Sequence, residues 1–168
     1  MQKSNCTSAA VLTETAPPKE SPASKQEEIL VPIDFSESSV TALRHARALA
    51  EEGRTQVILL NVVEAPGSFR KSDVLRQQRA FYTQRAERLQ ELADRELGSQ
   101  VASRIEVREG KPTVEILRLA SQRRVDLIVV GRHERHGPRR WLRAHTATQL
   151  SKKATCPVLL LQAAHHLN

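Results

Sequence analysis

The stretch Val125-Asp126-Leu127-Ile128-Val129-Val130-Gly131 decides the fold of this chain. Apart from one acid the run is apolar, it is rich in β-branched residues, and a glycine ends it. A short run of this kind is typical of a strand that is buried on both faces, as the strands of parallel sheets are. The sequence therefore predicts an α/β protein in which this strand lies inside a parallel sheet.

The residues behind Gly131 change character abruptly. Residues 132–140 are polar, strongly basic and interrupted by a Gly-Pro breaker, which predicts a loop. A helical pattern runs from about 141 to 153, and a second apolar run follows at 158–161. Because ligands in open α/β sheets sit at the carboxyl ends of the strands, the basic loop is the first candidate site.

Strands and helices alternate along the rest of the chain as well. Strands are predicted at 29–34, 57–63 and 101–107, and the helices that follow them begin near 36, 72 and 112. Ser36 is a suitable N-cap for the first helix, and Gly53 is expected to end it. This alternation implies right-handed crossovers and an open five-stranded parallel sheet with helices on both faces. The polar and apolar residues of 101–107 alternate, as in an edge strand.

The two ends of the chain differ from this pattern. Residues 1–26 have no hydrophobic period and are rich in proline and serine, so they are predicted to be a disordered tail. A single domain is expected over residues 27–163, followed by a short tail at 164–168. The N-terminal tail is either a passive extension or a docking segment.

The charge balance is basic, with a net charge of +7 and a pI near 10.0. On the predicted helices, however, lysine and arginine alternate with glutamate, which is typical of a solvated face. Aromatic residues make up 3% of the chain, too few for a stacking platform on single-stranded nucleic acid. Nucleic acid is therefore not an expected partner.

The cysteine content and the apolar runs bear on the compartment. Cys6 lies in the predicted tail and Cys156 just before the last strand, so no disulfide is expected between them. No run approaches the ~20 apolar residues of a membrane span, and no signal peptide is visible. The expected location is the cytoplasm.

Two stretches carry a resemblance to the universal stress protein family. The opening Val31-Pro32-Ile33-Asp34-Phe35-Ser36 is similar to the first strand and turn of its members. Behind the fourth strand the family has the signature Gly-x2-Gly-x9-Gly-Ser/Thr, then a helix, then a final strand that Pro-Val opens, as Pro157-Val158 does here. The resemblance covers about residues 28–162 and implies a Rossmann-like sheet with the strand order 3-2-1-4-5.

Most of the glycine signature is replaced in this chain. Gly131 takes the first glycine position, but Glu134, Ala144 and His145 stand where the family has glycine, glycine and serine or threonine. In the ATP-binding branch this loop wraps the phosphates. A glutamate adds bulk and one like charge, which costs about 4 kcal/mol at ~4 Å and an effective dielectric of ~20. Nucleotide binding is therefore expected to be weak or lost, with ATP as the open alternative.

The resemblance also implies where a nucleotide would sit. Asp34 matches the aspartate that contacts the adenine end of the ligand, and Val62 and Val130 match apolar positions around the base. With Gly131 these are the cofactor-binding candidates. The alternative interpretation makes Asp34 a brace of the turn that follows it, and makes both valines ordinary core residues.

Catalytic and metal-binding motifs are absent from the sequence. It contains no phosphate-binding Gly-x4-Gly-Lys-Ser/Thr motif and no Gly-x-Ser-x-Gly elbow, so no catalytic residue is assigned and an enzyme is not expected, although slow ATP hydrolysis stays open. His133, His136 and His145 lack a nearby cysteine or acid cluster, so they are not assigned to a metal.

These observations favour a homodimeric cytoplasmic regulatory or interaction module with an unknown protein partner. The run Val158-Leu159-Leu160-Leu161 resembles the strand that pairs across the family's dimer axis, and an apolar sheet edge requires cover. One alternative is an ATP-binding switch of the same fold. Another is a binder of nucleic acid or anionic surfaces that uses the arginines of the basic loop, which are Arg132, Arg135, Arg139, Arg140 and Arg143.

Overall fold

The computed structural model describes residues 26–63, 74–132 and 144–162. Strands and helices alternate strictly along these residues. The elements are β1 (Glu27–Pro32), α1 (Glu37–Leu49), β2 (Thr55–Val63), α2 (Val74–Glu96), β3 (Ala102–Glu109), α3 (Pro112–Arg123), β4 (Leu127–Arg132), α4 (Ala144–Lys153) and β5 (Val158–Gln162).

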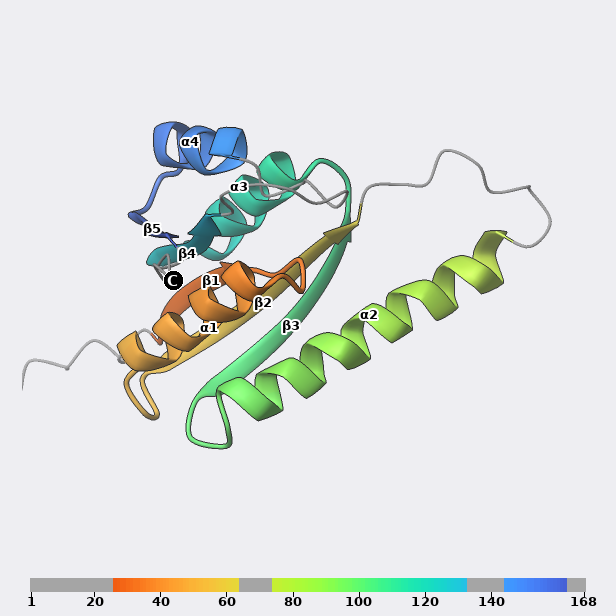
Figure 1. Cartoon of the computed structure of the whole chain (residues 1–168), viewed down its shortest axis with the longest axis horizontal. Helices are drawn as coiled ribbons and strands as arrows, with labels where there is room; N and C mark the ends of the chain where they lie inside the picture. The colour runs from red at the N-terminus through yellow and green to blue at the C-terminus, as the bar shows by residue number, and fades with distance from the viewer. Residues whose placement is uncertain (1–25, 64–73, 133–143, 163–168) are drawn as a thin grey trace, which may run out of the picture.

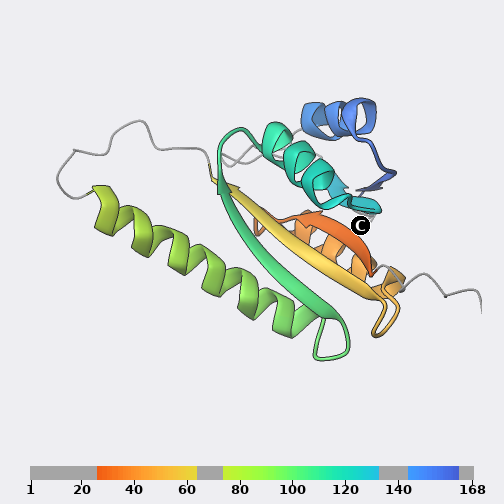
Figure 2. The same ribbon diagram turned by 180° about the vertical axis from the view of Figure 1, so that it is seen from behind.

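The five strands form one parallel sheet in the order β3-β2-β1-β4-β5. Helices α1 and α2 cover one face of this sheet, and α3 and α4 cover the other (Figures 1 and 2). The predicted α/β class, parallel sheet and strand order are therefore confirmed. Helix α2 runs beside β3 and diverges from the sheet toward its amino-terminal end (Figure 1).

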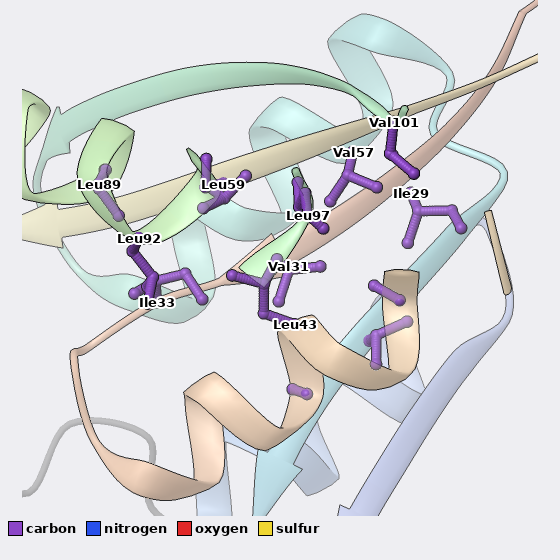
Figure 3. Packing of buried hydrophobic residues seen from close by; sticks show 14 residues of the cluster. Ile29, Val31, Ile33, Leu43, Val57, Leu59, Leu89, Leu92, Leu97 and Val101 are labelled. Atoms are coloured by element: carbon purple, nitrogen blue, oxygen red, sulfur yellow. The ribbon is translucent and has the colours of Figure 1, made fainter. Parts of the chain in front are cut away.

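Each face of the sheet has its own hydrophobic core, because successive side chains of a strand point to opposite faces. On the α1–α2 face, Val31, Leu59 and Leu92 are buried together (Figure 3). On the α3–α4 face the buried set includes Leu30, Ile58 and other residues, namely Leu60, Val62, Ile116, Leu119, Ile128, Val130 and Leu150. The central strands are thus apolar in both parities, as the unbroken runs in the sequence predict.

Pro32 limits the pairing between β1 and β4. Alternate residues of a parallel strand direct their N–H groups to opposite neighbours, and Ile33 N–H donates to Leu60 of β2 at 2.8 Å. The position of Pro32 therefore faces β4, and proline has no N–H to give. In the described strands the register of β1 with β4 covers two pairs, Ile29–Leu127 and Leu30–Ile128. No further pair between these two strands follows toward the carboxyl edge of the sheet in the described residues.

The predicted end of the first helix was wrong by several residues. Helix α1 ends at Leu49, and Gly53 lies in the following turn with φ +72°. The chain turns earlier because Glu51 N–H donates to the hydroxyl of buried Thr55 at 3.0 Å, and Thr55 N–H donates back to the Glu51 carbonyl at 3.0 Å. These bonds close the turn without a glycine at the helix end.

The remaining helices agree with the prediction where they are described. Helix α3 begins at Pro112, its first helical residue, and α4 ends at Lys153. Residues 141–143, the predicted start of α4, lie outside the described residues, as do the tails expected at 1–26, apart from residue 26, and at 164–168. Within the described part of the chain, no helix is both long enough and apolar enough to cross a membrane.

Candidate functional site

Asp34 lies at the carboxyl end of β1 and braces its own turn. Its Oδ1 accepts a hydrogen bond from Ser36 N–H at 3.0 Å and a second one from the Ser36 hydroxyl. Phe35, between them, has φ +64°, a left-handed conformation that is rare for an aromatic residue. Asp34 therefore braces the turn that follows it, and its role as a nucleotide contact stays a prediction.

Ser36 continues this turn into helix α1. Its hydroxyl accepts from Ser39 N–H at 3.3 Å and lies 3.0 Å from the Ser38 hydroxyl, so the predicted N-cap is confirmed. Glu37 in the first turn carries the charge that the positive end of the helix dipole favours. Asp34, Ser36 and Ser38 thus form one hydrogen-bonded chain at the carboxyl edge of the sheet.

Gly131 is required by close packing against the same helix. A Cβ atom on this residue would lie 2.0 Å from the Ser38 carbonyl oxygen and 2.4 Å from the Ser38 carbonyl carbon. Both are backbone atoms that cannot turn aside as a flexible side chain can. The glycine therefore lets the first turn of α1 approach β4, and this role needs no ligand.

Val62 and Val130 lie in the core of the opposite face. Their exposed fractions are 4% and 0%, and both pack in the cluster that α3 and α4 cover. The four cofactor-binding candidates are therefore divided by the sheet. Asp34 and Gly131 lie around the first turn of α1, whereas the two valines are buried on the other face of the sheet.

The side chains that replace the family signature lie outside the described residues. Glu134, His133 and His136 lie outside the described residues. Ala144 and His145 are the first two residues of α4, and their side chains are also outside the described set. Among the described residues, no group of three or more histidine, cysteine or acidic side chains is arranged to hold a metal ion.

Cys156, just before β5, is a free thiol that is half-buried. Burial raises the pKa of this thiol, and the negative charge of Asp126 raises it further. The thiolate is the nucleophilic form of cysteine, so these surroundings disfavour reactivity at Cys156.

The sequence interpretation missed Asn61, the one polar residue inside the apolar run of β2. Its Nδ2 donates to the Ile33 carbonyl at 2.7 Å, where β1 leaves the sheet. Its Oδ1 is buried and accepts no hydrogen bond from the described residues. A polar residue within 57–63 was a visible signal of this role, because a buried amide requires a partner.

A set of stacked arginines and aromatic rings was missed as well. The guanidinium carbon of Arg88 lies 4.3 Å from the centroid of the Phe35 ring. The guanidinium carbon of Arg85 lies 5.7 Å from that centroid and 4.9 Å from the centroid of Phe81. No sequence signal predicted these contacts, because about fifty residues separate Phe35 from the two arginines of α2.

An open parallel sheet with a turn, a helix N-terminus and a glycine at its switch point is the site architecture of many doubly wound proteins. Residues 26–162 match the family model of the universal stress protein family, and the chain belongs to that family. Over 143 residues it is 30% identical to Universal stress protein MJ0531 of Methanocaldococcus jannaschii, covering 80% of this chain and 81% of that protein.

Solved structures agree with this assignment. The structure of MJ0577, a protein of the same organism, has a TM-score of 0.60 and 26% identity, covering 84% of this chain and 99% of that one. Universal stress protein UspA from Lactobacillus plantarum has a TM-score of 0.59 and 25% identity, covering 82% and 98%. The fold of the family is therefore the fold of this chain.

Proposed function

We propose that this chain is a homodimeric cytoplasmic regulatory module of the universal stress protein family in which nucleotide binding is weak or lost. The observation that carries this proposal is the structural use of Asp34 and Gly131. Asp34 accepts two hydrogen bonds from Ser36. A side chain at position 131 would collide with the Ser38 carbonyl, so only glycine fits there. The fold itself therefore accounts for the presence of both residues, without a bound ligand.

The replaced signature positions support the same proposal. Family glycines let backbone N–H groups approach a phosphate, and Glu134 places a Cβ and a negative charge there instead. His145 stands in place of a hydroxyl donor. In this proposal the module signals through a protein partner and not through catalysis.

The dimer rests on β5. Leu160 keeps 40% of its surface exposed, and its neighbours in the strand are half-buried. An open apolar edge is covered when a second copy adds its own β5 in a two-fold arrangement. The interface would place the two copies edge to edge.

Calorimetry with Mg-ATP tests the nucleotide part of the proposal. We expect no binding of submicromolar affinity by the wild-type protein, and no ATP, ADP or AMP released when the purified protein is denatured. The triple variant Glu134→Gly, Ala144→Gly, His145→Ser should gain measurable affinity, most of it from the first substitution. Asp34→Ala in the triple variant is the matched control and should reduce the gain.

The alternative function is the ATP-binding switch. Submicromolar binding by the wild-type protein would establish it and refute our proposal. If even the triple variant binds nothing, the nucleotide pocket is closed elsewhere, and the buried Val62 and Val130 are the residues to examine.

A further inference from the structure

Arg88 is used differently from half of the fourteen arginines of the described chain. Seven of them form an ion pair with a carboxylate, namely Arg44, Arg54, Arg95, Arg104, Arg108, Arg118 and Arg123. Arg88 is exposed and lies over the Phe35 ring at 4.3 Å. Within the residues that the structure describes it makes no ion pair or hydrogen bond. No described residue therefore occupies its N–H donors.

The ring beneath Arg88 is held in a fixed position. Phe35 is half-buried against the core, and the Asp34–Ser36 hydrogen bonds fix the turn on which it stands. Arg85 lies between Phe35 and Phe81, so rings and cations alternate where α2 crosses the turn after β1. A guanidinium over a ring keeps its N–H groups at its edge, where they bind an anion with little loss of side-chain freedom.

We propose that Arg88 on the Phe35 ring is a docking site for a carboxylate side chain of an acidic partner protein. The inference rests on the proposed function as an interaction module and deepens it by naming the chemistry of the partner. One available guanidinium matches one carboxylate through two parallel N–H···O bonds. The net charge of +7 favours an acidic partner at longer range.

Two acidic neighbours on α2 sharpen the inference. Glu87 and Glu91 are exposed on the same part of the helix, and neither pairs with Arg88. Their charges oppose an incoming carboxylate without neutralising the arginine. Removing one of them should therefore strengthen docking, the opposite of removing Arg88.

The probe is a hexaglutamate peptide. Its binding is measured by NMR of the arginine Nε–Hε signals of the protein, in the absence of nucleotide. We expect a saturable shift of the Arg88 signal, and a peptide affinity that falls at least fivefold in Arg88→Ala. Arg88→Lys keeps the charge but not the planar fork, so it should also lose affinity. Glu91→Gln should gain about twofold.

Arg79 provides the matched control. It is exposed on the same helix and, in the described chain, has no ring contact and no ion pair. Arg79→Ala should keep the wild-type affinity within twofold, and hexaglutamine should not bind. Circular dichroism of each variant shows whether it is folded.

Three results would overturn the docking site: equal affinity of Arg88→Ala and wild type, an equal loss in Arg79→Ala, or full binding by Arg88→Lys. Equal displacement of the peptide by inorganic phosphate at the same concentration would show a general anion site instead. ATP binding by the wild type would refute the proposed function but would not change the shift of the Arg88 signal on adding peptide. Failure of the proposed function and failure of the docking site are therefore distinguishable.

Discussion

The two edges of the sheet are built in opposite ways. Along β3 the side chains toward α3 are charged, and Glu106 pairs with Arg104 at 2.9 Å and lies 3.9 Å from Arg108. Arg108 also reaches Glu115 of α3 at 3.7 Å. Strand β5 carries no charged residue, and Leu160 is among the most exposed large apolar side chains of the described chain.

This difference between the two edges indicates where the sheet can add another strand. Charged side chains on an edge strand oppose pairing with a further chain, whereas an apolar edge without charges invites it. We therefore expect self-association at β5 and not at β3.

The largest effect is expected from Gly131→Ala, in the strand that attaches β5 to the sheet. Its Cβ would lie 2.0 Å from the Ser38 carbonyl, so α1 must move off β4. We expect a loss of at least about 3 kcal/mol in the free energy of unfolding, measured by urea denaturation. Gly98→Ala is the control, because Gly98 has φ +69° but open space around it, and it should lose only about 1 kcal/mol. Equal losses would show that no clash exists at Gly131.

Leu160→Lys should abolish the apolar edge of β5. We expect the dimer dissociation constant to rise roughly 30-fold or more, equivalent to about 2 kcal/mol, as measured by analytical ultracentrifugation. Val114→Lys is the control, because Val114 is 54% exposed but lies on α3. A wild-type protein that is monomeric at micromolar concentration would disprove the dimer.

The reverse change on the other edge is Arg104→Val with Glu106→Val. Removing the charges should let β3 pair between molecules, so light scattering should detect species larger than a dimer. The free energy of unfolding should change by less than about 1 kcal/mol, because exposed ion pairs contribute little. The variant Arg104→Gln with Glu106→Gln removes the charges but keeps polar side chains. Species larger than a dimer in that variant would show that charge, and not polarity, prevents pairing at β3.

Glu96 supports the α2 side of the sheet and gives a pH dependence. It accepts hydrogen bonds from Arg44 at 2.8 Å and from Arg95 at 3.0 Å, and the Arg44 bond is the main reason that its pKa is lowered. A lowered folded pKa means that the stabilisation is present above the unfolded pKa, ~4.3, and is lost as the pH falls through the folded value.

Glu96→Gln should therefore cost about 1 kcal/mol at pH 7 and should flatten the acid side of the stability curve below about pH 4. Chemical denaturation between pH 2 and 7 measures both effects. Glu51→Gln is the control, because Glu51 pairs with Arg54 on the surface, where both side chains are more than 60% exposed. A curve for Glu96→Gln parallel to that of the wild type would contradict the prediction.

The smallest effect is expected from deleting residues 1–26. Strand β1 begins at Glu27, in the middle of the sheet, and the composition of the deleted residues predicts a tail that contributes little to folding. The thermal midpoint should hold within a few degrees. A drop of more than about 5 °C, roughly 1 kcal/mol, would show that the tail packs on the domain.

The sequence predicted most of the fold, because the information was local. The apolar runs of β2 and β4, the N-cap at Ser36 and the proline that opens α3 each identify an element without its neighbours. The strand order needed the family resemblance, since hydrophobic period does not say which strands are adjacent. The early end of α1 was missed because it depends on the side chain of Thr55, beyond the helix.

The contacts of the candidate-site residues could not be predicted, because they join segments that are distant in the sequence. Motif spacing selected Gly131, but only the structure shows how closely it packs against the Ser38 carbonyl. The stacking of Arg88 on Phe35 depends on how α2 crosses the turn after β1, and no residue pattern encodes that crossing. Contacts between distant segments are what the sequence left open.

Pro32 also bears on how the domain unfolds in parts. Because the register between β1 and β4 is two pairs long, the sheet divides there into a three-stranded unit and a two-stranded one. Two strands are too few to be stable alone, whereas β3, β2 and β1 keep a core under α1 and α2. We therefore expect hydrogen exchange to show β4, α4 and β5 opening together before the rest of the sheet, while the amide hydrogens of β2 stay protected.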